Sequence, residues 1–443
     1  MKTIKATALA LLLGISALWW LADGAALSAA SGVFPWRSLM MQYTGVLTFS
    51  AMSVAIMLAS RPVWIESFFG GLDKMYRLHK WLGISVLVLG ISHWLWVKAP
   101  KWLVEAGWLI RPPRGKRPDQ SVEIFSFFQN NRGLAEQIGE WASYLALILI
   151  AIALIKRFPY RYFSQSHRLL ALIYLALVVH TAMLMSFHYW TLPIGMVMAI
   201  LMLAGTASAL NSLLQRIGDS RKAIAVINQL DYYDGVGVNA ITLQLKSRWP
   251  KHEAGQFAFV TFDSGEGAHP FTLSSAWKGD GKILLLIKAL GDYTQTLASS
   301  LKTGDLVTIE GPYGRFNFSG SAQRQIWIGG GIGITPFIAR MQALALKPDG
   351  RVIDLFHVTK EVDDAALSLL TADAAAAGVN LHLFIDARDG HLTGEYLRNT
   401  VTDWQAADVW FCGPTAFADA IRDDLLQHGL PPEQFHQELF AMR

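Results

Sequence analysis

The stretch HRLLALIYLALVVH, residues 167 to 180, places a histidine at each end of an apolar run. Such a run is typical of a helix that crosses a membrane. An imidazole is costly inside a bilayer, because it is polar and can take up a proton. The two histidines therefore need a role, and a second apolar run, bounded by His79 and His93, raises the same question.

The composition points to a protein that lies partly in lipid. The chain of 443 residues is long enough for two or three domains, and 52% of it is hydrophobic, too much for an ordinary soluble protein. The single cysteine, Cys412, excludes an internal disulfide and a thiolate-held metal cluster, so histidine is the obvious metal ligand. The net charge of +4 is mild and no basic run dominates, which argues against binding to nucleic acid.

Six apolar segments are long enough to span a bilayer. The first also has the pattern of a secretory signal peptide, although Trp19 and Trp20 at its far end favour a membrane helix. The segments cover about residues 6 to 22, 39 to 59, 80 to 97, 140 to 155, 169 to 186 and 190 to 210.

The distribution of basic residues predicts the orientation. Lysines and arginines usually mark the cytoplasmic side, and Lys5, Arg77, Arg161 and Arg216 share one side with the long polar remainder of the chain. The connection over residues 98 to 138 is also basic and disagrees with this arrangement. We predict a multi-pass protein of the cell inner membrane whose C-terminal part is cytoplasmic.

The polar remainder of the chain shows two different sequence patterns. Short strand patterns such as VNAITLQL and KILLLIKAL predict an antiparallel β-barrel over residues 222 to 322. Strand and helix patterns alternate over residues 323 to 443 and predict a parallel α/β layer. With a membrane domain over residues 1 to 215, the chain is expected to be a multi-domain membrane protein with three parts.

The four histidines form two matched pairs in this arrangement. His79 and His93 lie about 40° apart around a helix and about 21 Å apart along it, whereas an ideal helix rotates His180 about 140° from His167. Inner histidines can pair with each other, as can outer ones, and each pair suits the two axial positions of a haem better than a zinc site. A single histidine is often only an interhelical hydrogen bonder, which is how we interpret His188.

Two stretches of the β domain are candidates for binding a flavin. HPFTLSSA, residues 269 to 276, follows a strand and has a polar and then apolar edge, although an ordinary turn would read the same way. IKALGDYTQTLASSL, residues 287 to 301, runs from a strand into a helix. The free amides of a helix start bind anions, and Lys288 adds positive charge near Thr294 at the cap.

Three stretches of the α/β layer are candidates for binding a nucleotide. IWIGGGIGITPF, residues 326 to 337, lets a pyrophosphate approach bare backbone amides, although its spacing is not that of the Rossmann motif. WFCGPTAF, residues 410 to 417, ends a strand at the edge where such sheets bind ligands. In FHVTKE, residues 356 to 361, Lys360 could neutralise a 2′-phosphate, which favours NADPH, but Glu361 follows and leaves NADH open.

Together the histidines and the motifs resemble the transmembrane NADPH oxidase and ferric reductase superfamily over nearly the full length. The resemblance implies a six-helix haem domain followed by a reductase module similar to ferredoxin-NADP reductase, with FAD, two b-type haems and NADPH or NADH as cofactors. It implies that His79, His93, His167 and His180 are axial ligands. Lys288 stands where the family often has arginine, and Phe440 is followed by three residues although family members commonly end near it.

The resemblance also implies roles for residues of the reductase module. Cys412 lies beside the nicotinamide and Phe440 shields the flavin ring. His269, Pro270, Phe271, Thr272, Lys288 and Thr294 contact the flavin, and Gly329, Gly330, Gly331, Gly333, Thr335, Pro336, Lys360, Cys412, Gly413 and Pro414 contact the nucleotide.

The implied activity is transfer of electrons from cytosolic NAD(P)H through FAD and the haems to an acceptor across the membrane. Oxygen, giving superoxide, and a ferric chelate are equally suited, and a periplasmic protein is a third acceptor. A different reading is a transporter or channel with a regulatory nucleotide-binding domain, whose membrane histidines relay protons.

Overall fold

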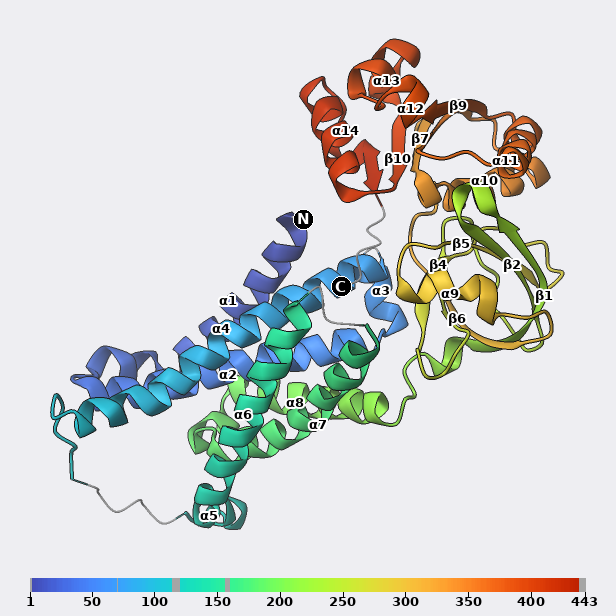
Figure 1. Cartoon of the computed structure of the whole chain (residues 1–443). Coiled ribbons are helices and arrows are strands. Elements are labelled where there is room, and N and C mark those ends of the chain that lie inside the picture. Colours follow the sequence, from blue (N-terminus) through green and yellow to red (C-terminus); the bar gives the residue numbers. More distant parts are fainter. Residues whose placement is uncertain (1, 70, 114–119, 156–159, 438–443) are drawn as a thin grey trace. The chain divides into compact units, whose positions relative to one another are not determined.

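A computed structural model describes residues 2–69, 71–113, 120–155 and 160–437. Phe440 lies outside these residues. The chain divides into two units, one formed mainly by residues 2–217 and the other mainly by residues 218–437. The first, the membrane unit, is helical, and the second, the reductase unit, holds both sheets (Figure 1).

Six helices of the membrane unit are long and apolar enough to cross a membrane, which confirms the predicted number of spans. They are α1 (Lys2–Ala29), α2 (Val33–Ala59), α4 (Leu72–Glu105), α6 (Arg132–Leu154), α7 (Tyr160–Leu184) and α8 (Pro193–Leu213). Three shorter helices accompany them, α3 (Val63–Phe69), α5 (Glu123–Asn130) and the 3₁₀ turn η1 (Phe187–Thr191).

Most of the six helices extend beyond the segments that hydropathy delimits. Backbone hydrogen bonds must be satisfied in and near lipid, so a helix continues past the end of its apolar stretch. In this way α4 begins before His79 and α7 begins before His167. All four candidate ligands therefore lie within just two helices.

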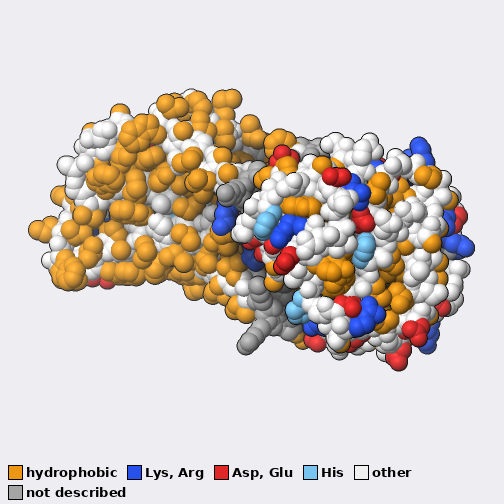
Figure 2. All heavy atoms as spheres, turned by 90° about the horizontal axis from the view of Figure 1, so that it is seen from above, with side chains coloured by type: hydrophobic (Ala, Val, Ile, Leu, Met, Phe, Trp, Pro, Cys, Tyr) orange, Lys and Arg blue, Asp and Glu red, His pale blue; other side chains and the backbone are white. Residues whose placement is uncertain are grey.

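Several buried polar groups of the membrane unit are paired across helices. Tyr174 is fully buried, and its hydroxyl lies 2.9 Å from Ser53 Oγ and donates to the carbonyl of Leu201. Near the end of α1, Trp19 Nε1 donates to the Tyr189 hydroxyl, which donates to Asp23. On the outer surface, the face seen in Figure 2 is covered by hydrophobic side chains over this unit, as contact with lipid requires.

The first sheet of the reductase unit is antiparallel, as its alternating strands predict. Its strands are β1 (Lys222–Tyr233), β2 (Val238–Leu245), β3 (Phe257–Thr261), β4 (His269–Thr272), β5 (Lys282–Lys288) and β6 (Leu306–Tyr313), in the order β4-β3-β6-β1-β2-β5. The described residues form no ladder between the edge strands β4 and β5. Ser274, just after β4, bonds to Leu284 and Leu286 of β5, and a closed barrel remains a prediction.

The second sheet is parallel throughout, which agrees with the predicted α/β layer. Its strands are β7 (Arg324–Gly330), β8 (Val352–Thr359), β9 (Asn380–Ile385), β10 (Asp408–Cys412) and β11 (Phe435–Gln437), in the order β11-β10-β7-β8-β9. The helices of this layer are α10 (Thr335–Leu346), α11 (Asp364–Ala377), α12 (Asp386–Asp389), α13 (Gly394–Thr400) and α14 (Thr415–Gln427). β11 is too short to leave a strand pattern in the sequence.

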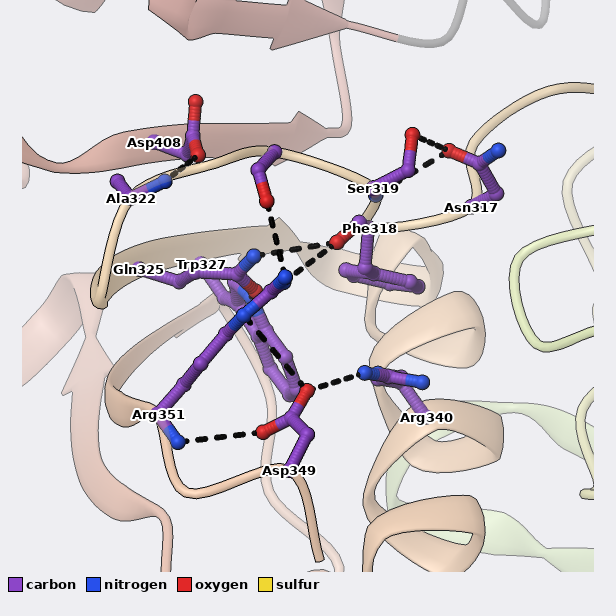
Figure 3. A network of polar contacts seen from close by, with 11 residues as sticks. Asn317, Phe318, Ser319, Ala322, Gln325, Trp327, Arg340, Asp349, Arg351 and Asp408 are labelled. Atoms are coloured by element: carbon purple, nitrogen blue, oxygen red, sulfur yellow. Dashed lines mark hydrogen bonds and ion pairs between the residues drawn. The ribbon is translucent and has the colours of Figure 1, made fainter.

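The segment that leads from β6 to β7 is fixed by a polar network (Figure 3). Arg351 donates to the carbonyls of Phe318 and Gly320, at 2.8 and 2.9 Å. Gln325 Nε2 also donates to Phe318, and the Asp408 carboxylate accepts from the amide of Ala322. Phe318, whose φ is 59°, is thus held against the second sheet by its backbone. This network fixes the connector between β6 and β7 against the second sheet.

Candidate cofactor sites

Three of the four membrane histidines use Nδ1 as a hydrogen-bond donor. His79 Nδ1 lies 2.8 Å from the carbonyl of Ala55, and His180 Nδ1 lies 2.9 Å from that of Ala135. His93 Nδ1 lies 3.2 Å from the hydroxyl of Thr44, whose own proton goes to the carbonyl of Met40. Because these partners can only accept, each Nδ1 carries the hydrogen. Nε2 is then left with a lone pair for a metal.

The structure brings histidines of α4 and α7 together. The rings of His79 and His167 have centroids 5.8 Å apart and planes inclined by 70°. His93 of α4 and His180 of α7 form the second pair and lie within range of electrostatic interaction. His167 stacks on Phe163, and its buried Nδ1 has no hydrogen-bond partner among the described residues.

Two glycines provide the room that these imidazoles occupy. A Cβ on Gly139 of α6 would overlap the ring of His180, and one on Gly45 of α2 would come within 3.2 Å of His93 Cε1. Space is therefore reserved beside the ligating faces of α4 and α7.

These residues fit a pair of haems. Each pair offers two imidazoles, whereas a structural zinc site takes four ligands in a tetrahedral arrangement. A haem iron would take two nitrogen ligands, and each imidazole pair could supply them, with Nδ1 of three of the four rings bonded to a backbone carbonyl or a hydroxyl.

The reductase unit contains a cleft of about 1390 Å³ between its two sheets. Most of the residues predicted for the flavin and the nucleotide line it. From the first sheet these are Pro270, Phe271, Thr272, Lys288 and Thr294, and from the second Gly330, Gly331, Gly333, Thr335, Lys360, Gly413 and Pro414. His269, Gly329, Pro336 and Cys412 are not among the lining residues and stand behind them.

The first sheet contributes a strand edge and a helix start to the cleft. Helix α9 (Asp292–Ser300) begins there, and Thr294 Oγ1 accepts from the amides of Leu290 and Gly291, each at 3.0 Å. His269 stacks on Tyr293 of this helix, with ring centroids 4.5 Å apart. Burial lowers the pKa of His269, so near neutral pH the imidazole packs as an uncharged ring.

Lys288 of the first sheet forms an ion pair with a residue that follows a strand of the second sheet. Its Nζ lies 3.4 Å from a carboxylate oxygen of Glu361, which follows β8. Both residues line the cleft, so the cation predicted for a flavin phosphate lies beside the acid that follows Lys360. The sequence motifs that contain the two residues gave no sign of this contact.

Glycines let two loops of the second sheet touch by their backbones. A Cβ on Gly333 would collide with the carbonyl of Cys412, and one on Gly330 would lie 3.0 Å from Pro414 Cδ. Gly331 has φ of 56°, which favours glycine. The loops that follow β7 and β10 therefore meet at the carboxyl edge of the sheet, where ligands of such folds bind. Cys412 is fully buried beneath them.

Several residues that line the cleft were not predicted from the sequence. Asp386 and His391 follow β9, with His391 Nδ1 3.6 Å from the Asp386 carboxylate. The rule that examines the residue after each strand would have found Asp386, had it been applied to β9 as well as β8. The turn over residues 234–237 also lines the cleft, and only the folded sheet brings it there.

The fold and these sites define a class: a membrane protein with paired histidines joined to a reductase with a cleft for flavin and nucleotide. Residues 44–178 match the family described as ferric reductase like transmembrane component. Residues 228–317 match the family described as FAD-binding domain. The two matches, in this order along one chain, are consistent with the ferric reductase and NADPH oxidase superfamily and agree with the resemblance.

Relatives of the reductase unit are known from several systems. The chain is 26% identical over 197 residues to the toluate 1,2-dioxygenase electron transfer component of Pseudomonas putida, covering 42% of this chain and 58% of that one. It is 24% identical over 163 residues to the flavohemoprotein of Oceanobacillus iheyensis, covering 34% and 40%. The matches thus span about half the length of these relatives.

A solved structure with a similar arrangement is the FAD/NAD-binding domain of nitric oxide dioxygenase from Vibrio cholerae. It is 20% identical, covers 49% of this chain and 97% of its own, and has a TM-score of 0.42.

Proposed function

We propose that this protein takes electrons from NAD(P)H at the reductase unit and delivers them to an acceptor on the far side of the membrane. The observation that carries the proposal is the presence of two histidine pairs, each within the membrane helices, in one chain with an FAD-binding domain. A transmembrane electron-transfer oxidoreductase is the class that these two parts define. The finer assignments below are proposals built on it.

His79, His93, His167 and His180 are proposed to hold two b-type haems. A flavin can take up one hydride, which carries two electrons, and release the electrons one at a time, and haem iron carries one electron at a time, so the bound groups together would supply the redox chemistry. Hydrogen bonds within the chain orient the imidazole rings. Ala55, Ala135 and Thr44 accept from Nδ1 and thereby orient Nε2 of His79, His180 and His93.

The flavin is proposed to bind along β4 and at the start of α9. Pro270, Phe271 and Thr272 offer an apolar strand edge with a hydroxyl for the ring, and the α9 start with Lys288 offers amides and a cation for the phosphates. His269 supports this region through Tyr293. The resemblance assigns a shielding role to Phe440, which stays a prediction.

The nucleotide is proposed to bind over the loops that follow β7 and β10. Gly330, Gly331, Gly333 and Gly413 leave backbone amides accessible to a pyrophosphate, and Thr335 and Pro336 begin α10 beside them. The carbonyl of Cys412 lies directly against Gly333 of the first of these loops. Gly329 continues β7 into the loop.

The choice between NADPH and NADH depends on charges around the cleft. Lys360 favours a 2′-phosphate, whereas an acidic residue at a strand end favours a ribose hydroxyl, and Asp386 stands in such a position. Replacing Asp386 by serine removes a repulsive carboxylate and should raise kcat/KM for NADPH relative to NADH about tenfold. Glu105→Gln, in the membrane unit, is the control.

Oxygen and a ferric chelate are both proposed as acceptors, with a periplasmic protein as the third. Turnover with NADPH or NADH should be measured under air with and without superoxide dismutase, and under argon with ferric citrate. A rate seen only in air removes the iron hypothesis, and a rate seen only with iron removes the oxidase. A protein inactive with both acceptors but reduced by the nucleotide points to a protein partner.

The haem assignment has a direct test. The purified chain should show a Soret band that shifts on reduction. His93→Ala and His180→Ala should remove far-side reduction while nucleotide still reduces the flavin. A colourless protein after reconstitution with haem would refute electron transfer through the membrane and would favour the transporter or channel.

The proposed orientation places the reductase unit in the cytoplasm and the chain in the inner membrane. It depends on the basic residues of the connections and on the cytosolic location of NAD(P)H. Protease digestion of intact spheroplasts should leave the reductase unit uncut, and cleavage there would reverse the orientation.

A further inference from the structure

The membrane unit contains a second cavity that the proposed function does not use. Its volume is about 310 Å³, at the lower end of the range for small-molecule sites. Its walls come from α1, α2, α3 and α4, and all but Thr7 are apolar. They are Thr7, Ala8, Leu11, Val54, Leu58, Ile65, Phe68, Phe69, Leu78 and Leu82.

The walls of this cavity are mostly buried while its rim is open. Leu58, Leu78 and Leu82 are nearly inaccessible, whereas Phe68 of the short helix α3 is 83% exposed. Phe68 and Phe69 pack edge to face, with ring centroids 5.2 Å apart. A dry apolar cavity holds an apolar ligand rather than water. The exposed rim in a helical membrane unit makes a hydrocarbon chain the natural occupant.

Basic side chains lie one helical turn from the cavity walls. Lys5 precedes Ala8 by three residues on α1, and Lys74 precedes Leu78 by four on α4, so each shares a helix face with a wall residue. Lys5 Nζ lies over the ring of Trp81, 4.6 Å from its centroid, which ties α1 to α4 at this end.

The residues around this cavity also carry a net positive charge. Residues 61 to 80 contain Arg61, Lys74, Arg77 and Lys80 against Glu66 and Asp73. Basic pockets between membrane helices bind the head groups of anionic lipids. We propose that this cavity is a binding site for one anionic phospholipid, whose acyl chain enters between α1 and α4 and whose phosphate lies near Lys5 and Lys74.

The site is separate from the proposed haem ligands but adjoins one of them. Val54 and Leu58 flank Ala55, whose carbonyl accepts from His79, and Leu78 is the neighbour of His79. An acyl chain in the cavity would therefore support the seam between α2 and α4. The proposal does not require haem or flavin, so it can fail or succeed independently of the proposed activity.

The test measures which lipid the full chain retains. The protein is incubated in detergent with equal amounts of phosphatidylglycerol and phosphatidylcholine that carry the same acyl chains, and native mass spectrometry reads the bound lipid. Wild type should retain phosphatidylglycerol preferentially. Lys5→Gln should lower this preference about fivefold, the ratio that corresponds to about 1 kcal/mol per basic residue near a membrane surface. Lys101→Gln, at the other end of α4, should leave it unchanged.

A second variant tests the cavity itself. Ala8→Phe places a ring in the acyl-chain space and should abolish retention, while Val88→Phe, which adds the same bulk to an exposed position of α4, should not. Helix content by circular dichroism checks that both variants fold. Equal retention of the two lipids, retention unchanged by Ala8→Phe, or a bound quinone in place of phospholipid would each overturn the proposal.

Discussion

The two units of this protein build their sites in opposite ways. In the membrane unit the candidate ligands lie inside two long helices, and their hydrogen bonds go to Ala55 and Ala135 carbonyls on neighbouring helices and to one hydroxyl. In the reductase unit the lining residues come from loops and strand ends scattered between positions 234 and 424. Lipid forces polar groups to be satisfied within helices, whereas a water-soluble fold can place its chemistry on loops supported by a sheet.

Glycines also have different roles in the two units. Gly45 and Gly139 make room for imidazole rings in the membrane unit, whereas Gly330 and Gly333 let two backbones touch in the reductase unit. Substitutions at these positions should therefore damage different cofactors. Four predictions follow this contrast from the largest effect to the smallest.

Gly139→Ala should remove the outer haem. The added methyl group occupies the space of the His180 ring, so we expect the haem absorbance to fall to roughly half while the flavin is retained. The measurement is a reduced-minus-oxidised spectrum normalised to flavin. Gly133→Ala lies on the same helix with no neighbour within 4 Å and is the control. A full haem complement in Gly139→Ala would contradict the pairing of His93 with His180.

Gly333→Ala should impair the nucleotide site and leave the haem spectrum intact. The methyl group collides with the Cys412 carbonyl, so the two loops must move apart at the nucleotide site, and we expect kcat/KM to fall about 100-fold, which corresponds to about 2.7 kcal/mol. Steady-state kinetics with an artificial dye as acceptor give the value. Gly331→Ala meets no neighbour and should lose less, because only its positive φ opposes the side chain. Equal losses in the two variants would show that backbone conformation, not the loop contact, matters.

Asp23→Asn should lower the stability of the membrane unit. The Asp23 carboxylate accepts from the buried Tyr189 hydroxyl and lies 3.1 Å from His188 Nε2. His188, which the sequence analysis interprets as an interhelical hydrogen bonder, lies beside this buried acid. Loss of a charged hydrogen-bond acceptor should cost about 2 kcal/mol of unfolding free energy.

The effect of Asp23→Asn should appear as a lower midpoint for thermal loss of helix content. Glu105→Gln, an exposed acid of α4, serves as the comparison. A midpoint that does not change would mean that the Tyr189 contact is not needed to hold α1.

Asp354→Asn should lower the stability of the reductase unit by a smaller amount that depends on pH. Burial raises the pKa of Asp354, but hydrogen bonds from His382 and Asn380 and the charge of Arg324 outweigh it, so the net pKa is lowered. Its stabilisation is therefore present above the unfolded carboxyl pKa of about 3.9 and is lost as the pH falls through the lower folded value.

Denaturation of wild type and Asp354→Asn at several pH values measures this contribution. The difference in unfolding free energy should be about 1 kcal/mol near neutral pH and should vanish in acid. Asp234→Asn, on a turn at the surface, should show no such dependence. A difference that grows as the pH falls would reverse the sign argued here.

The sequence was most informative where a pattern repeats along one segment. The six spans, the boundaries of β2 and β8, and the parallel order of the second sheet follow from apolar periodicity. The glycine stretch after β7 and the residues around Thr272 were recognisable because their chemistry is local. Most of them do line the cleft.

What the sequence could not supply depends on contacts between distant segments. The neighbour of Lys288 is Glu361, the neighbour of His188 is Asp23, and the ring of His180 needs Gly139 of another helix. Asp386 and the turn over residues 234–237 reach the cleft only when the sheets are assembled. Periodicity records which face of a helix or strand is buried, and together with the histidines and the local motifs it determined the expected class of this protein. Pairing across tens or hundreds of residues is set by packing, so the tertiary structure decided which polar groups face each other and where the room for each cofactor lies.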